Sequence, residues 1–209
     1  MTAVRWLLLD IGGVLELVDD ATWPDAFARR WERRLGLDPG EYDRRLAAVD
    51  LPDATRTAGV ADRYWREVAA ALGADDEDRV AMIGDFWDAY CGRRNDLLLD
   101  YLATVRDRVG LAILSNSGDG AREEEESRYA FSKLFDPILY SHEIGVLKPD
   151  DDAFRLTLSA LDAEPDDVLF LDDAPHNVDA ARRCGIRAHL YVDAGSAIRT
   201  IEQALTSDD

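Results

Sequence analysis

The sequence is poor in cysteine, lacks an excess of positive charge and contains no long hydrophobic run. Its 209 residues include two cysteines, Cys91 and Cys184, far apart and without the spacing of metal ligands, so we expect a reduced, cytoplasmic protein. The formal net charge of -19 argues against nucleic acid and anionic membranes as partners, because both attract basic faces. The apolar stretch from Trp6 to Leu9 ends at Asp10 and is too short for a signal or membrane segment. We interpret the acidity as a solvated surface, and a divalent cation is the partner that such an excess of carboxylates suits best.

Apolar runs alternate with helical periodicity through the second half of the chain. Near-continuous apolar strands separated by helices are typical of a parallel sheet that helices cover on both faces. We therefore predict an α/β fold, with a Rossmann-like core made of residues 1–16 and 95–209. Strands are expected at residues 4–9, 111–114, 138–140, 168–171 and 188–192. Helices are expected at residues 97–106, which Asn95 would cap, and at residues 151–161, 178–184 and 197–205.

Residues 17–94 differ in character, because strand-like runs give way to helical periodicity. Trp23, Phe27 and Trp31 recur every four residues, which places them on one face of a helix. Two further apolar stripes follow, at Tyr64, Trp65, Val68 and Leu72 and at Val80, Ile83, Phe86, Trp87 and Tyr90. We interpret the stripes as packing surfaces rather than ligand contacts, since amphipathic faces normally bury against each other. The segment is predicted to be an all-helical insert, and its arginines are interpreted as solvated charges.

Four polar positions, called marks below, end an apolar run or follow one closely: Asp10, Ser115, Lys148 and the pair Asp172-Asp173. Ligands of a parallel sheet bind beyond the carboxyl ends of its strands, so these side chains can meet in one crevice despite their separation in sequence. Taken alone, each has an ordinary explanation as a turn residue, an acid at a helix N-terminus or a solvated loop residue. Together they predict a site for phosphoryl transfer.

The chemistry of each group fits that prediction. Asp10 can act as a nucleophile that forms an aspartyl-phosphate, and the glycine pair that ends with Gly13 lets the backbone approach a ligand closely. Ser115 and Asn116 can hold phosphate oxygens through a hydroxyl and backbone N–H groups. Lys148 can neutralise the charge of the phosphate and of the nucleophile.

The pair Asp172-Asp173 adds a metal to this prediction. Two adjacent carboxylates at the end of a buried strand repel each other unless a cation or protons separate them. Mg²⁺ favours one or two carboxylates together with phosphate and water as ligands. The expected cofactor is therefore Mg²⁺.

In this order, the four marks resemble the haloacid dehalogenase superfamily of hydrolases, over residues 4–15 and about 95–205. The segment from Tyr140 to Asp150, with Asn177, is similar to the branch that contains bacterial sugar-phosphate phosphatases and the phosphatase domain of epoxide hydrolases. The resemblance implies that residues 17–94 are a cap domain. It also implies a Mg²⁺-dependent phosphatase that acts on a small phosphorylated metabolite.

The resemblance further implies a role for each residue of the predicted site. Asp10 would be the nucleophile, and Ser115 and Lys148 would bind the phosphoryl group. The implied Mg²⁺ ligands are Asp10, Asp173, the nearby Asp172 and the carbonyl of Gly12.

Gly12 departs from the superfamily pattern, because most of its phosphatases carry an acid–base aspartate at this position. Loss of general acid–base help costs roughly 10²–10⁴-fold in rate. His176 and Glu16 are the candidates for a substitute acid. Gly12 also leaves open a non-catalytic relative that only binds phosphate or a metabolite. A dehalogenase is the weaker alternative, because the Asp172-Asp173 pair would repel a carboxylate substrate. The oligomeric state is left open.

Overall fold

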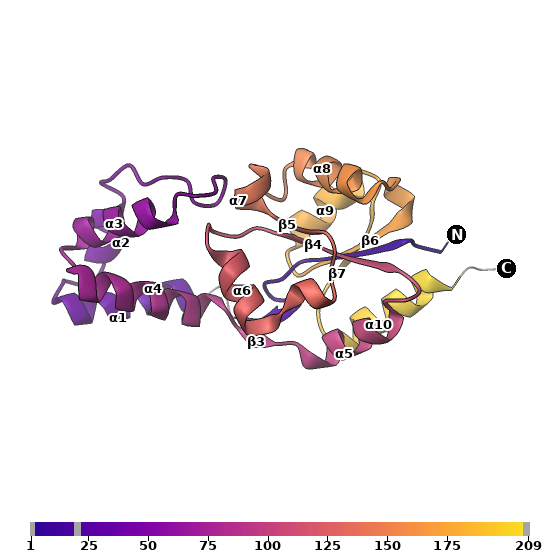
Figure 1. The fold of residues 1–209 in the computed structure, drawn as a ribbon, viewed down its shortest axis with the longest axis horizontal. Coiled ribbons are helices and arrows are strands. Elements are labelled where there is room, and N and C mark those ends of the chain that lie inside the picture. The colour runs from indigo at the N-terminus through magenta and orange to yellow at the C-terminus, as the bar shows by residue number, and fades with distance from the viewer. Residues whose placement is uncertain (1–2, 19–21, 207–209) are drawn as a thin grey trace.

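A five-stranded parallel sheet lies at the centre of the computed structural model, which describes residues 3–18 and 22–206 (Figure 1). Its strands are β1 (Trp6–Leu9), β4 (Gly110–Ser115), β5 (Ile138–Tyr140), β6 (Val168–Asp172) and β7 (Arg187–Leu190). Their order across the sheet is β5-β4-β1-β6-β7, and each neighbouring pair is parallel. The predicted α/β fold is confirmed.

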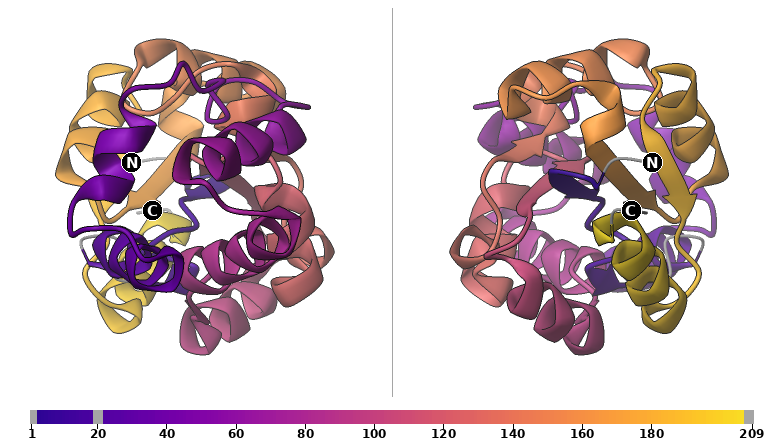
Figure 2. Two further views of the ribbon diagram at one scale, coloured as in Figure 1. Left: turned by 90° about the vertical axis from the view of Figure 1, so that its left-hand side faces the viewer. Right: turned by 90° about the vertical axis from the view of Figure 1, so that its right-hand side faces the viewer.

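Helices cover both faces of the sheet. They are α5 (Asp96–Val105), α6 (Ala121–Tyr129), α7 (Ser141–Ile144), α8 (Asp151–Leu161), α9 (Pro175–Arg183) and α10 (Ala194–Leu205), with short 3₁₀ helices at Phe131–Lys133 and Pro165–Asp167. Successive strand residues point to opposite faces, so Leu7 and Leu9 join a hydrophobic cluster with α5 and α10, whereas Leu8 joins one with α8 and α9. Figures 1 and 2 show these two helix layers on opposite sides of the sheet. Among the described residues, no helix combines the length and the apolar character that crossing a membrane requires.

The helical insert forms a separate group at one end of the molecule (Figure 1). Its helices are α1 (Trp23–Leu35), α2 (Glu41–Leu46), α3 (Ala61–Leu72) and α4 (Asp76–Tyr90). They pack around their own hydrophobic cluster, which includes Phe27, Trp31 and Trp65. Val80 does not share in this packing, contrary to the predicted stripe, since 62% of it is exposed.

Two short antiparallel strands, β2 (Glu16–Leu17) and β3 (Arg93–Arg94), form a ribbon where the chain passes between the sheet and the helical insert. Leu17 lies opposite Arg93, and Glu16 lies opposite Arg94. The ribbon coincides with the boundaries expected for residues 17–94. The division into two domains itself stays a prediction.

The differences between expectation and structure have local causes. The sequence does not predict α6, because most of its residues are charged and its buried positions are only Ala121 and Glu125. Helix α9 begins at Pro175 rather than at residue 178, because proline suits the first turn of a helix. Asn95 caps α5 as predicted, since its side chain accepts a hydrogen bond from the backbone N–H of Leu98.

Candidate active site

The carboxyl ends of β1 and β6 bring the acidic residues of the predicted site together. Leu9 of β1 pairs with Leu171 of β6, and the backbone N–H of Asp10 donates to the Leu171 carbonyl at 3.0 Å. Asp172 is therefore the neighbour of Asp10 across the sheet, as the last residue of β6 rather than a residue of the following loop. Asp173 follows at the rim and is exposed.

Lys148 joins this group from the loop between α7 and α8. Its Nζ lies 2.7 Å from Asp10 Oδ1 and 2.7 Å from Asp172 Oδ2, and only 3% of the residue is exposed. Lysine occurs at only two positions of the sequence, Lys133 and Lys148, whereas arginine is plentiful. A compact ammonium can fit between two carboxylates where a planar guanidinium would need more room. The structure thus brings together three of the four predicted marks through one buried cation.

The side chain of Asn116 fixes the position of Lys148. The backbone N–H of Lys148 donates to Asn116 Oδ1 at 2.8 Å, and Asn116 Nδ2 donates to the Lys148 carbonyl at 2.8 Å. Both polar atoms of this side chain are thereby engaged with the lysine backbone. A phosphate contact by Asn116, as the sequence predicts, would therefore involve its backbone N–H, and it stays a prediction.

Asp172 is held from three sides and is wholly buried. Asn177 Nδ2 lies 3.1 Å from each of its oxygens, the backbone N–H of Ala174 donates to Oδ1 at 2.8 Å, and Lys148 donates to Oδ2. A carboxylate that accepts this many hydrogen bonds is held in one orientation. Asp172 is therefore well suited to orient Lys148.

Burial has opposite consequences for the two ends of the Lys148–Asp10 pair. Burial raises the pKa of Asp10, Lys148 lowers it, and the nearby Asp172 raises it again, with a net rise. Burial alone would lower the pKa of Lys148, but the charges of Asp10 and Asp172 outweigh this effect and raise it. Lys148 therefore stays protonated, and protons compete with any cation for the Asp10 carboxylate.

Asp10, Asp172 and Asp173 could together hold a metal ion. Each offers one carboxylate oxygen, and the three oxygens lie within 4.8 Å of one another. Gly13 has a left-handed φ of 71°, and a Cβ at this position would lie 2.1 Å from Asp173 Oδ2, so the missing side chain leaves the space that this carboxylate occupies. A donor set of oxygens alone suits a hard cation such as Mg²⁺. The residues present therefore fit the cofactor predicted from the sequence.

The acidic cluster opens into a cavity of about 300 Å³. Asp10, Gly12 and Asp173 line it together with Glu16, Tyr90, Asn116, Ala174 and Asn177. Ser115 ends β4 beside this region and is 2% exposed, but it is not among the lining residues, and neither are Lys148 and Gly13.

The two candidates for a substitute acid lie in different surroundings. Glu16 is 1% exposed, forms an isolated bridge with Gly12 and lines the same cavity as Asp10. His176 is exposed in the first turn of α9 and lines none of the described cavities. The structure therefore brings Glu16, and not His176, to the site.

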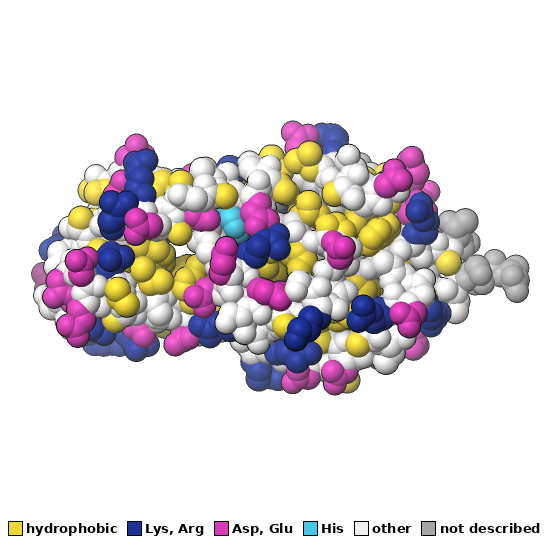
Figure 3. Space-filling view, viewed as in Figure 1, with side chains coloured by type: hydrophobic (Ala, Val, Ile, Leu, Met, Phe, Trp, Pro, Cys, Tyr) yellow, Lys and Arg dark blue, Asp and Glu magenta, His cyan; other side chains and the backbone are white. Residues whose placement is uncertain are grey.

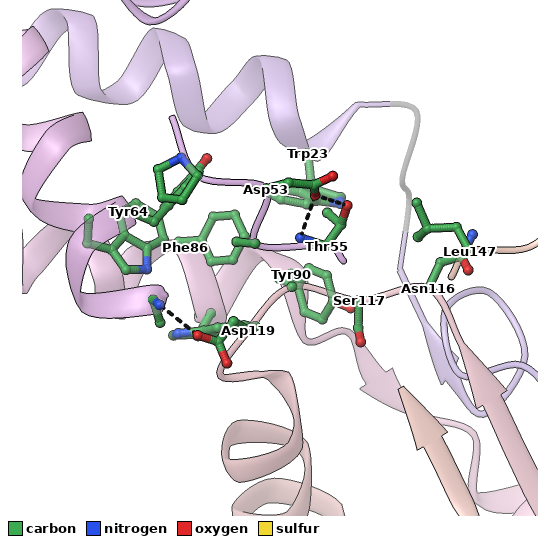
Figure 4. A pocket seen from close by; sticks show the side chains of 16 residues that line it. Trp23, Asp53, Thr55, Tyr64, Phe86, Tyr90, Asn116, Ser117, Asp119 and Leu147 are labelled. Carbon is green, nitrogen blue, oxygen red and sulfur yellow. Dashed lines mark hydrogen bonds between the residues drawn. The ribbon is translucent and has the colours of Figure 1, made fainter. Parts of the chain in front are cut away.

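A second cavity of about 410 Å³ lies beside the first, between the helical insert and the loop after β4 (Figure 4). Its aromatic lining comes from Trp23, Tyr64, Trp65, Phe86, Trp87 and Tyr90. The helical periodicity of these side chains predicts that they are packing residues. They do pack against one another, and at the same time they border a space large enough for a ligand.

Comparison with known proteins connects this geometry with one family. The model of the haloacid dehalogenase-like hydrolase family matches residues 95–190. Bifunctional epoxide hydrolase 2 of Mus musculus is 26% identical over 219 residues, covering 96% of this chain and 39% of the relative. Phosphoserine phosphatase of Thermus thermophilus is 34% identical over 97 residues, covering 46% of this chain and 39% of the relative. The predicted resemblance to haloacid dehalogenase-like hydrolases is confirmed.

The fold agrees with this result. A solved structure of a haloacid dehalogenase family enzyme from Bacteroides thetaiotaomicron, in complex with magnesium, has a TM-score of 0.70 at 19% identity and covers 91% of this chain and 94% of that one. The chain spans less than half the length of the two curated relatives. Ser115, Lys148, Asp172 and Asp173 lie inside the segment that matches the haloacid dehalogenase-like model, whereas Asp10 lies before it.

Sequence reasoning predicted Asn116 as a phosphate contact but missed its contact with the Lys148 backbone, and it interpreted Tyr90 only as a packing residue. Asn116 clamps the loop of Lys148, and Tyr90 stands between the two cavities. The pairing of Asn116 with Lys148 across the sheet edge leaves no local signal in the sequence. For Tyr90 the sequence does contain a local signal, because aromatic residues are unusually dense at the end of α4.

Proposed function

We propose that this chain is a Mg²⁺-dependent phosphatase that hydrolyses a small phosphorylated metabolite through an aspartyl-phosphate on Asp10. The observation that carries the proposal is the position of the Lys148 ammonium, 2.7 Å from Asp10 and 2.7 Å from Asp172, beside the acidic cluster. The likeness to a phosphoserine phosphatase, and to a family enzyme solved with magnesium, supports it.

In the first step, an oxygen of the Asp10 carboxylate attacks the phosphorus atom and the bond from phosphorus to the substrate oxygen breaks. The departing alkoxide takes a proton and leaves as an alcohol. Water then attacks the phosphorus of the aspartyl-phosphate, which releases inorganic phosphate and restores the carboxylate. Lys148 neutralises part of the charge on Asp10 and on the phosphoryl oxygens, and Ser115 would donate a hydrogen bond to one of these oxygens.

Mg²⁺, when bound, would neutralise phosphoryl charge, and its ligands would be Asp10, Asp173 and the Gly12 carbonyl, with Asp172 nearby. Asp172 has a second task that does not depend on the metal, because it holds the Lys148 ammonium toward Asp10. Gly13 would let the phosphoryl group approach the backbone.

The proton for the departing oxygen has no obvious donor at Gly12, which carries no side chain. Glu16 is the candidate, because it is buried and lines the same cavity as Asp10. If no group supplies the proton, the rate depends on how stable the departing anion is by itself. A protein that only binds phosphate is the alternative that Gly12 favours.

The partners follow from charge and surface. With a net charge of -19, we propose that neither nucleic acid nor a membrane surface is a partner and that the protein acts in the cytoplasm. Acidic and basic side chains lie interspersed on the face shown in Figure 3, with no broad basic region on it.

Hydrolysis of acetyl phosphate and p-nitrophenyl phosphate, with and without Mg²⁺, tests the proposal. Asp10→Asn should abolish turnover, and beryllium fluoride should attach to the Asp10 carboxylate in a crystal of the wild type. Asp179→Asn, an exposed acid of α9, is the matched control and should keep wild-type turnover. Binding of inorganic phosphate without any turnover would favour the binding protein instead.

A further inference from the structure

The cavity of about 410 Å³ has walls of aromatic rings that hold one another in place. Phe86 of α4 is at the centre of this arrangement. Its ring centroid lies 5.4 Å from that of Trp23 and 5.0 Å from that of Trp65, both edge-on. It also lies 5.8 Å from Tyr90, in a stacked geometry. Rings fixed in this way offer a preformed surface to an apolar ligand. Binding then costs little entropy, because few side chains have to become ordered.

The two acids that line this cavity already accept hydrogen bonds from the protein. Asp119 Oδ2 accepts hydrogen bonds from the backbone N–H groups of Val60 and Ala61, at 2.7 and 2.6 Å. Asp53 Oδ1 accepts from the Thr55 hydroxyl at 2.7 Å and from its backbone N–H at 3.0 Å. Figure 4 shows both acids at the edge of the aromatic surface. A ligand with many hydroxyl groups would lose its hydrogen bonds to water here and regain few.

No lysine, arginine or histidine lines the cavity within the described part of the chain. Arg30 and Arg34 of the helical insert pair with Asp85 and Asp78, away from the cavity. Arg56 pairs with Asp53 at 3.6 Å and with Asp150 at 3.8 Å, but it does not line the cavity. A second anionic group on the ligand would therefore find no basic side chain in the cavity wall. It would instead meet the carboxylates of Asp53 and Asp119.

The aromatic cavity and the catalytic cavity share part of their lining. Tyr90 of the helical insert and Asn116 of the loop after β4 border both. A phosphomonoester with its phosphoryl group at Asp10 would therefore extend past Tyr90 into the aromatic cavity. Its organic part would occupy that space.

We propose that this organic part is uncharged and apolar, and preferably aromatic. This inference rests on the proposed phosphatase function for the phosphoryl group, and on the aromatic cavity for the remainder of the molecule. It excludes two classes as preferred substrates: sugar phosphates, which carry hydroxyl groups, and phosphates with a second anionic group. Phosphates of cationic alcohols are the remaining alternative, because aromatic rings also bind ammonium groups.

The test compares substrates whose departing alcohols are similar. 2-Naphthylmethyl phosphate, glucose 6-phosphate and phosphocholine all release a primary alcohol, so differences in kcat/KM report on the organic part. We expect 2-naphthylmethyl phosphate to exceed both others by about tenfold or more. Calorimetry of 2-naphthylmethanol, which carries no phosphate, measures binding at the aromatic cavity independently of catalysis.

Ala54→Trp places a bulky ring in the cavity, since Ala54 lines it, and Ala58→Trp adds the same ring at an exposed position of the same loop. The first variant should weaken 2-naphthylmethanol binding by about tenfold or more, and should lower the ratio of kcat/KM for 2-naphthylmethyl phosphate to that for acetyl phosphate by a similar factor. Ala58→Trp should match the wild type in both measurements.

The possible outcomes separate the two proposals. Hydrolysis of acetyl phosphate without binding of 2-naphthylmethanol overturns the apolar substrate and keeps the phosphatase. Binding of 2-naphthylmethanol that Ala54→Trp weakens, without hydrolysis of any phosphate, supports the apolar site and overturns the phosphatase. A preference for phosphocholine or glucose 6-phosphate, or equal binding by the wild type and Ala54→Trp, overturns the apolar substrate.

Discussion

Replacement of Gly13 by alanine should impair metal binding far more than folding. Gly13 has a φ of 71°, and a Cβ built on it would lie 2.1 Å from Asp173 Oδ2 and 2.5 Å from Asp173 Cγ. Both distances are far below van der Waals contact, so the Asp173 carboxylate must turn away. Because Asp173 is exposed, this movement costs the fold little. The left-handed backbone adds about 1–2 kcal/mol for a residue with a Cβ.

Gly13→Ala should therefore lower the free energy of unfolding by about 1–2 kcal/mol, which urea titration without metal measures. Mg²⁺ affinity should fall by about tenfold or more, because one acidic ligand leaves the cluster; a loss of this size corresponds to about 1.4 kcal/mol. Calorimetric titration with Mg²⁺ measures this second effect.

Gly36→Ala is the matched control. Gly36 ends α1 with a φ of 67°, and a Cβ there would meet nothing within 4 Å. Its replacement should cost a similar amount of stability and leave Mg²⁺ binding unchanged. Wild-type Mg²⁺ affinity in Gly13→Ala would refute the assignment of Asp173 as a ligand that Gly13 accommodates.

Three further replacements test buried and catalytic features of the structure. Burial raises the pKa of Glu125 from 4.5 to about 8. The unfolded chain therefore loses this proton first, and wild-type stability should decline between pH 4.5 and 8, by up to about 5 kcal/mol at about 1.4 kcal/mol per pKa unit. Glu125→Gln should flatten the decline in urea titrations from pH 5 to 9, and parallel curves for the two proteins would contradict the shift. Lys148→Met should remove turnover and cost about 3–5 kcal/mol of stability, because it leaves buried carboxylates without their counter-charge. Mg²⁺ should restore part of that stability in urea titrations, and a variant as stable as the wild type would speak against the buried pair. Gly12→Asp should raise kcat/KM for alkyl phosphates by up to about 10²–10⁴-fold and for aryl phosphates by less, so equal gains for both would disprove a missing proton donor.

The sequence predicts β1, β4 and β6 well because these strands are short, apolar and almost wholly buried. Strand β5 and helix α8 begin and end at the residues expected for them. Helix α6 could not be predicted in this way, since most of its side chains are charged and only Ala121 and Glu125 are buried. Its stability comes from contacts with distant segments. The buried Glu125 of that helix, which accepts a hydrogen bond from Tyr140, is one such contact.

Part of the candidate site could likewise be predicted from the sequence, and part could not. Asp10 and the pair Asp172-Asp173 stand out because these acids come at the end of an apolar strand. Lys148 stands out as a lysine in the loop that follows such a strand. The aromatic cavity could not be predicted, because a stripe that packs against other helices and a stripe that borders a cavity have the same periodicity. Tyr90 does both, because it packs against a hydrophobic cluster and also lines the cavity.

The central place of β1 in the sheet governs how the chain acquires its fold. Trp6 pairs with Gly110 on one side and with Val168 on the other, so both partners of β1 are synthesised long after it. Parallel pairing between such distant segments is slow, because loop closure must precede the contacts that stabilise it. Until β6 is present, one edge of β1 has no partner, and leucine side chains that end wholly buried meet water. Self-association during synthesis and refolding is therefore most acute before residue 172 is in place, and Asp10 reaches its neighbours only when nearly the whole chain has been made.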